Sequence, residues 1–174
     1  MIAVAEHLVA EGWTSPEGLI LRGGSAGGLM AGAVANQAPG LFAGVVANVA
    51  FVDALTTILD PSQPLTVTEW EEWGNPTESE EIFEAMLAYS PYENVTAQDY
   101  PSIFATGGFH DTRVNYWEPT KWVQRLRHIG TGTAPILLWT DLGAGHGGPS
   151  GRYESWREEA RILAYILWVV GLEN

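Results

Sequence analysis

The chain has 174 residues, of which 46% are hydrophobic, so it suits one domain or a part of a larger one and is too apolar for disorder throughout. It contains no cysteine, which excludes a disulfide framework, thiolate metal ligands and a cysteine nucleophile. Eight Lys and Arg against 21 Asp and Glu give a net charge of −13, which argues against a nucleic-acid partner because the phosphate backbone is also negative.

The first half of the chain alternates between helix and strand patterns. Residues 2–11 have apolar side chains at helical spacing, and the apolar run of residues 18–22 predicts a buried strand. A glycine-rich turn follows, after which residues 26–37 predict a helix of small side chains and residues 43–49 a second buried strand. Residues 52–77 are expected to be irregular because prolines and a glycine interrupt them, and such segments are often functional.

The second half repeats the alternation. Residues 78–89 predict a helix, and the strands predicted at 102–106 and 136–140 are followed by helices at 117–129 and 153–170. This alternation is typical of a mostly parallel α/β sheet. The first strand would then be a bare apolar edge, which natural proteins normally cover, so we expect that an N-terminal part of the domain is absent.

No segment is expected to enter a membrane. The best candidate, Ile162–Val170, has nine residues, whereas a transmembrane helix needs about 20. The N-terminus lacks the basic start of a secretory signal and carries Glu6 and His7. We therefore expect a cytoplasmic protein without a membrane partner.

A nucleophile motif lies between the first predicted strand and the helix after it. Gly23, Ser25 and Gly27 match G-x-S-x-G, in which a sharp turn exposes the serine hydroxyl and side chains at the two flanking positions would collide. The helix start directs amides at developing negative charge, so the Ala26 N–H is the expected first oxyanion donor. The dinucleotide pattern G-x-G-x-x-G is not met, and the only lysine, Lys121, lies too far away for a P-loop. A purely structural tight turn is the remaining alternative.

A serine nucleophile needs a base, and the base needs a carboxylate that orients it. Asp111 follows the third predicted strand and His146 follows the fourth, in the chain order Ser, Asp, His that α/β-hydrolases use. Asp141 is the alternative orienting carboxylate, and His110 is an alternative base. These residues together predict a catalytic triad.

The other two histidines, His7 and His128, lie on predicted helices and are interpreted as surface or capping residues. Four scattered histidines without an H-E-x-x-H motif leave no cluster of metal ligands. We therefore expect neither a metal nor another cofactor.

Several longer stretches run almost from end to end of the chain: RGGSAGGLM, VANVAFVDALTTILD, PLTVTEWEEWGNP, YSPYENV, QDYPSIFATGGFHD, YWEPTKWVQRLR and GAGHGG. With them the chain resembles the C-terminal part of the catalytic domain of the prolyl oligopeptidase family of serine peptidases, most closely its oligopeptidase B branch. The resemblance implies the C-terminal half of an α/β-hydrolase fold with about four parallel strands. It also implies Ser25 as nucleophile, Asp111 as orienting acid and His146 as base.

The resemblance further implies parts outside these residues. Family members carry an N-terminal β-propeller and the first strands of the hydrolase sheet, and their second oxyanion donor, a tyrosine, lies in that upstream part. Residues 1–174 are therefore expected to form a partial peptidase domain without a propeller. We expect the missing N-terminal part to be its partner and the chain alone to have little activity.

Two glutamates of the irregular segment are candidates for substrate recognition. Glu69 and Glu71 alternate with Trp70 and Trp73, whose indoles can wall a pocket and exclude water. A carboxylate there pairs with a guanidinium, and a Trp face adds a cation–π attraction of about 0.5–2 kcal/mol. The resemblance implies that both carboxylates hold the basic side chain before the scissile bond. It also implies that Arg113 contacts a substrate carbonyl, with a simple salt bridge as the alternative.

The sequence therefore predicts a serine endopeptidase that cleaves short peptides after Arg or Lys through an acyl-enzyme. Two alternatives share the fold and the triad, namely a carboxylesterase with an apolar pocket and a proline-specific peptidase. A third alternative is a catalytically inactive fragment or module that only captures peptides.

Overall fold

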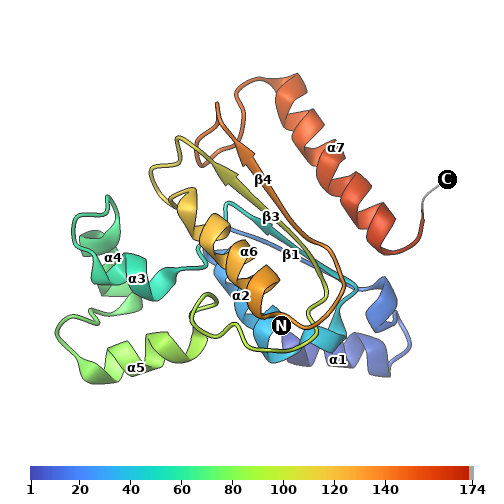
Figure 1. Cartoon of the computed structure of the whole chain (residues 1–174), viewed down its shortest axis with the longest axis horizontal. Helices are drawn as coiled ribbons and strands as arrows, with labels where there is room; N and C mark the ends of the chain where they lie inside the picture. The colour runs from blue at the N-terminus through green and yellow to red at the C-terminus, as the bar shows by residue number, and fades with distance from the viewer. Residues whose placement is uncertain (173–174) are drawn as a thin grey trace.

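Four parallel strands form the centre of the computed structural model, which describes residues 1–172 (Figure 1). They are β1 (Ile20–Gly24), β2 (Gly44–Asn48), β3 (Ser102–Gly108) and β4 (Ile136–Asp141), in the spatial order β1-β2-β3-β4. The predicted α/β class is confirmed. β1 begins later than predicted because Pro16–Gly18 forms a short 3-10 turn ahead of it.

The five predicted helices are all present and lie between or after the strands. They are α1 (Ile2–Ala10), α2 (Ala26–Gln37), α5 (Glu80–Tyr89), α6 (Trp117–Ile129) and α7 (Arg152–Val169). The bounds of α2 and α6 are those that the sequence predicted, and the other three differ by no more than two residues at either end.

Helices cover both faces of the sheet, with α7 on one side and α2 and α6 on the other (Figure 1). Alternate residues of β2 pack against the helices on opposite faces of the sheet. Val45 belongs to the cluster that Trp122 of α6 completes, whereas Val46 packs with Ile162 of α7. Both valines are fully buried at 0% exposure, which explains why the strand is a continuous apolar run rather than an alternating one.

Residues 52–77, which the sequence predicted to be irregular, contain two helices, so that prediction was wrong in part. They are α3 (Ala54–Leu59) and α4 (Thr66–Trp73). Pro61 and Pro64 lie between them, where a proline breaks no helical hydrogen bond. The helices α3, α4 and α5 lie together at one side of the sheet (Figure 1) and contribute to a second apolar cluster, which also includes Leu29 of α2.

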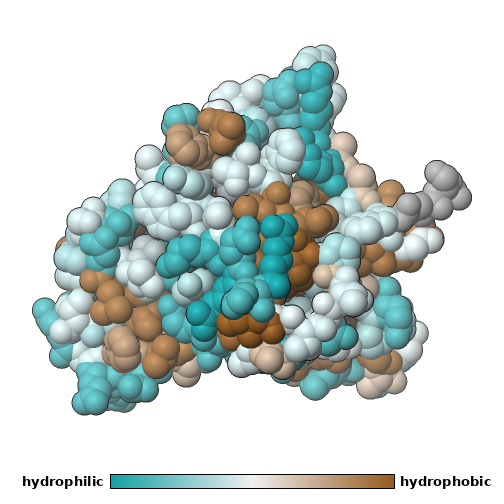
Figure 2. All heavy atoms as spheres, viewed as in Figure 1, coloured by the Kyte–Doolittle hydropathy of each residue, from teal (hydrophilic) through white to brown (hydrophobic). Residues whose placement is uncertain are grey.

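The strand β1 is an edge of the sheet, as expected. On the face shown in Figure 2, hydrophobic residues form separate patches among hydrophilic ones, and one patch lies over the region of α3 to α5 at the lower left. Within residues 1–172, no helix has the length and hydropathy needed to span a bilayer.

Candidate active site

Ser25 occupies a strained turn between the end of β1 and the start of α2. Its backbone has φ 56° and ψ −123°, a conformation that non-glycine residues rarely adopt. A Cβ on Gly23 would lie 2.1 Å from the carbonyl oxygen of Gly27, so only glycine fits there. The expected collision at Gly27 is wrong, because a Cβ at that position would meet nothing within 4 Å. The required close approach is instead at Gly28, where a Cβ would lie 2.5 Å from the Cβ of Ala50.

Backbone hydrogen bonds hold this turn against the neighbouring strand. The Ser25 N–H donates to the carbonyl oxygen of Asn48 at 2.9 Å, and the Ser25 carbonyl accepts from the N–H of Phe51 at 3.1 Å. The same carbonyl accepts from Gly28 at 2.8 Å and thereby closes the first turn of α2. The Ala26 N–H, at the exposed start of α2, has no acceptor among the described residues, so it is available to an oxyanion.

Asp111 and His146 meet beyond the ends of β3 and β4. The Nδ1 of His146 lies 2.8 Å from Oδ2 of Asp111, and the carboxylate is buried. The other oxygen, Oδ1, accepts from the backbone N–H groups of Arg113 at 2.8 Å and Val114 at 3.0 Å. These bonds fix the carboxylate, and a proton held on Nδ1 leaves Nε2 as the acceptor that a general base needs.

The alternative acid and base are placed differently. Oδ1 of Asp141 accepts from the N–H of Gly143 at 2.8 Å and so closes a local turn. His110 is exposed, and its ring lies edge-on to that of Phe109 at 5.2 Å. The sequence's first choice of Asp111 beside His146 is therefore the pair that the fold brings together.

Ser25 and His146 both lie at the carboxyl edge of the sheet, where ligands of α/β sheets normally bind. Within residues 1–172, no hydrogen bond joins the Ser25 hydroxyl to the His146 ring. His146 borders a hollow that is also lined by Gly23 and Gly24, the residues directly before the serine. Such catalytic hydrogen bonds are often long in a free enzyme and tighten only when substrate is bound.

A cavity of about 100 Å³ opens next to the serine. Its lining includes Ser25 and Ala26, Glu69 of α4, and Arg113 from the loop after β3. Glu69 is half-buried, whereas Glu71 is exposed and is not part of the lining. Residues two apart point to different sides of a helix, so the helix separates two carboxylates that the sequence grouped together.

Arg113 is exposed at the mouth of this cavity. No carboxylate of the described residues lies within ion-pair distance of it, so the alternative of a simple salt bridge has no partner there. Its guanidinium therefore remains available to a carbonyl or a carboxylate of a ligand.

Sequence reasoning missed several groups that form the cavity. Thr57 of α3 and Thr66 of α4 line it, and the loop residue Gln63 is held by the amide of Asn115 at 2.7 Å. No local pattern marks these residues, because they approach Ser25 only through the packing of α3 and α4.

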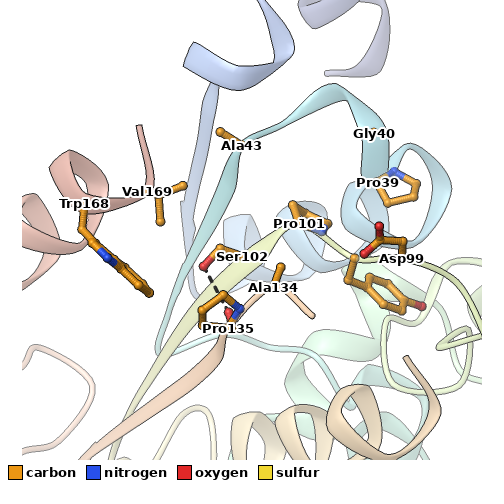
Figure 3. A pocket seen from close by; sticks show the side chains of 11 residues that line it. Pro39, Gly40, Ala43, Asp99, Pro101, Ser102, Ala134, Pro135, Trp168 and Val169 are labelled. Carbon is orange, nitrogen blue, oxygen red and sulfur yellow. Dashed lines mark hydrogen bonds between the residues drawn. The ribbon is translucent and has the colours of Figure 1, made fainter. Parts of the chain in front are cut away.

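A larger hollow, of about 410 Å³, lies at the opposite edge of the sheet (Figure 3). Prolines that precede β3 and β4 line it, and the Ser102 hydroxyl donates to the carbonyl of Pro135 at 3.1 Å. It is remote from the serine turn, at the amino ends of the strands. Across residues 1–172, no three His, Cys, Asp or Glu side chains gather in a way that could hold a metal ion.

The parallel sheet, its flanking helices and the strained strand–serine–helix turn place the chain in the α/β-hydrolase class of folds. The sequence profile of the prolyl oligopeptidase family matches residues 1–173, and the chain belongs to this family.

Known proteins similar to the chain are considerably longer. Protease 2 of Moraxella lacunata is 51% identical over 172 residues, which are 99% of this chain and 25% of that protein. Dipeptidyl aminopeptidase BI of Pseudoxanthomonas mexicana is 46% identical over 173 residues, 99% of this chain and 24% of that protein. The structure of oligopeptidase B from Trypanosoma brucei with covalently bound antipain is 49% identical with a TM-score of 0.95, covering 98% of this chain and 24% of that one. The chain thus spans about a quarter of the length of these relatives.

Proposed function

We propose that the chain carries the catalytic triad of a serine peptidase, with Ser25 as nucleophile, His146 as base and Asp111 as orienting acid. The proposal rests above all on the Asp111–His146 hydrogen bond of 2.8 Å, formed at the same edge of the sheet as the strained turn of Ser25. Membership of the prolyl oligopeptidase family supports it.

In this mechanism the Ser25 oxygen attacks the peptide carbonyl while His146 Nε2 accepts the hydroxyl proton. The tetrahedral oxyanion is stabilised by the free N–H of Ala26, and its collapse transfers the proton to the leaving amine. Water then attacks the acyl-enzyme with the same base and releases the acid product. Asp111 keeps the imidazole tautomer and stabilises the imidazolium.

The substrate class is proposed to be short peptides cleaved after Arg or Lys. The half-buried carboxylate of Glu69 shares a cavity with Ser25, which suits a basic side chain next to the scissile bond. Trp73 lines the same cavity and its ring centre lies 5.8 Å from that of Phe51, so the cavity offers a guanidinium aromatic surface as well as a carboxylate. Arg113 is proposed to bind a backbone carbonyl of the substrate.

A second candidate is the release of dipeptides from free N-termini. It is favoured by the 46% identity to a protein named dipeptidyl aminopeptidase BI. The two candidates share the triad and differ in what binds the N-terminal side of the substrate.

The test measures kcat/KM in the full natural protein with four substrates: an N-blocked Arg amide, an N-blocked Pro amide, a free dipeptidyl amide ending in Arg, and a short-chain ester. The Arg-selective endopeptidase is expected to prefer the blocked Arg amide. Preference for the free dipeptide would favour the second candidate, and preference for the Pro amide or the ester would overturn the substrate class.

Ser25→Ala is the control for the triad. It is expected to lower turnover by a factor on the order of 10⁶ and to abolish labelling by a fluorophosphonate probe. Wild-type turnover in this variant would show that Ser25 is not the nucleophile.

A further inference from the structure

Glu118 is a carboxyl side chain with no exposed surface, located in the first turn of α6. A fully buried glutamate is rare and costly unless its oxygens are bonded. Both of its oxygens form hydrogen bonds with the start of α3. Oε1 lies 2.8 Å from the Thr57 hydroxyl, and Oε2 accepts from the Asp53 N–H at 3.1 Å. Glu118 therefore joins the start of α6 to α3.

Two charged groups act on this carboxyl. Asp53, directly before α3, is buried and forms an ion pair with Lys121, one turn further along α6. The Lys121 ammonium also lies 4.5 Å from the centre of the Tyr92 ring, and the guanidinium of Arg125 lies 4.9 Å from the centre of the same ring. Lys121 thus supplies one positive charge beside two carboxyl groups, and it is already paired with Asp53.

The buried position makes the neutral form of Glu118 the favoured one. Burial raises the pKa of Glu118 to about 8, and the Asp53 carboxylate adds to the rise. The bonds from Thr57 and the Asp53 N–H oppose the rise, as does the charge of Lys121. At neutral pH the protonated carboxyl can share a hydrogen with Thr57 and still accept from the Asp53 N–H.

Further hydrogen bonds connect Thr57 to the residues that line the cavity beside Ser25. The Thr57 carbonyl accepts from the Thr66 hydroxyl at 2.8 Å, which holds α4 against α3. The indole of Trp70 makes a second bond of this kind, to the Ile58 carbonyl at 3.0 Å. Thr57, Thr66 and the α4 residue Glu69 all line the cavity beside Ser25.

The other end of the connection is the loop that carries the orienting acid. The N–H of Glu118 donates to the Asn115 carbonyl at 3.0 Å, which ties the start of α6 to the loop after β3. In the same loop, Asp111 accepts from the N–H groups of Arg113 and Val114. One helix start is therefore bonded both to the Asp111 loop and, through Glu118, to α3.

From these contacts we propose that Glu118 is a positioning residue whose neutral carboxyl holds α3, and through it the Glu69-bearing helix α4, at the correct place beside Ser25. It touches no substrate. The inference rests on the proposed function, because its effect on activity is expressed as binding of the basic side chain by Glu69.

Ionisation of Glu118 provides the test. Above pH 8 its negative charge is buried beside Asp53, and Lys121 is already paired with Asp53. The α3–α4 segment therefore loosens, and the fraction of molecules in which Glu69 is correctly placed, the competent fraction, falls. With a pKa of about 8 the competent fraction at pH 9 is about a tenth, so KM for a blocked Arg amide should rise about tenfold between pH 7 and 9, with kcat changing much less. Glu118→Gln, which keeps the shape and cannot ionise, should remove most of this rise.

Two further measurements keep the test independent of catalysis. Hydrogen exchange of residues 54–73, compared at pH 9 without substrate, should be faster in the wild type than in Glu118→Gln. Thr57→Val removes the bond without adding a titrating group, so it should already raise KM at pH 7. Because the lost bond lowers the pKa of Glu118, the further rise in KM between pH 7 and 9 should be smaller than in the wild type.

The outcomes separate the two proposals. Equal KM profiles and equal exchange in the wild type and Glu118→Gln would overturn the positioning role, even with activity that depends fully on Ser25. Activity that survives Ser25→Ala would overturn the proposed function, while the exchange measurement would still decide whether Glu118 holds α3 and α4 in place.

Discussion

The Nδ1 of His146 lies 2.8 Å from Oδ2 of Asp111, although the two residues are 35 positions apart in the chain. The parallel pairing of β3 with β4 produces this approach, because it brings the loops that follow the two strands to the same edge of the sheet. The carboxylate is buried and receives two backbone N–H groups in addition to the imidazole, so its position is set by the loop itself.

Asp111→Asn is expected to lower kcat by roughly 10⁴, because an amide can no longer favour the imidazole tautomer with its proton on Nδ1. The amide oxygen can still accept from the N–H groups of Arg113 and Val114, so the loop should keep its shape. Turnover of a blocked Arg amide is the measurement, with circular dichroism as the check on folding. A folded variant with nearly normal turnover would remove Asp111 from the mechanism.

Glu69→Gln is expected to weaken kcat/KM for Arg substrates by at least about 30-fold, since losing one partner of a desolvated charge pair costs about 2–5 kcal/mol. Glu71→Gln is the matched control. Glu71 is exposed on the same helix, and exposed pairs contribute about 0–1 kcal/mol, so its loss should matter far less. Equal losses in the two variants would restore the view that both carboxylates hold the substrate.

Local sequence patterns predicted the strands and most of the helices of this fold well. The helices α2 and α6 were predicted to their ends because their bounds are set by nearby signals, such as the glycine turn before Ala26 and the glycine after Ile129. The approach of His146 to Asp111 was equally predictable, because the two residues follow β4 and β3, and neighbouring parallel strands end at the same edge of a sheet.

The features that the sequence did not predict depend on contacts between residues far apart in the chain. Pro61 and Pro64 made the segment around Glu69 look irregular, whereas they lie in the connection between two helices that are stabilised by packing against α5. Glu118 carried no signal at all, because the hydroxyl it bonds belongs to Thr57, 61 residues earlier. A one-dimensional pattern does not register a buried polar contact of this kind.

Gly23→Ala is expected to destroy the serine turn, whereas Gly27→Ala should be tolerated. The added methyl at position 23 would lie 2.1 Å from a backbone oxygen that α2 holds in place, while at position 27 it meets nothing within 4 Å. Alanine is also favoured over glycine in a helix by up to about 1 kcal/mol, so Gly27→Ala should unfold at the same or a slightly higher temperature. Thermal unfolding and fluorophosphonate labelling of both variants test this prediction. Normal labelling of Gly23→Ala would contradict it.

The free energy of unfolding should depend on pH through Glu118. Its pKa is raised by burial from 4.5 to about 8 in the folded chain, so the folded state binds this proton more tightly than the unfolded state. The stabilising contribution is then fully present below pH 4.5 and is lost progressively as the pH rises through 8. Urea unfolding at pH 5, 7 and 9 measures this contribution as the difference in the free energy of unfolding between the wild type and Glu118→Gln. The other titrating groups are common to both proteins and cancel in this difference. The difference should shift in favour of the glutamine variant as the pH rises, and a constant difference would mean that Glu118 does not titrate in this range.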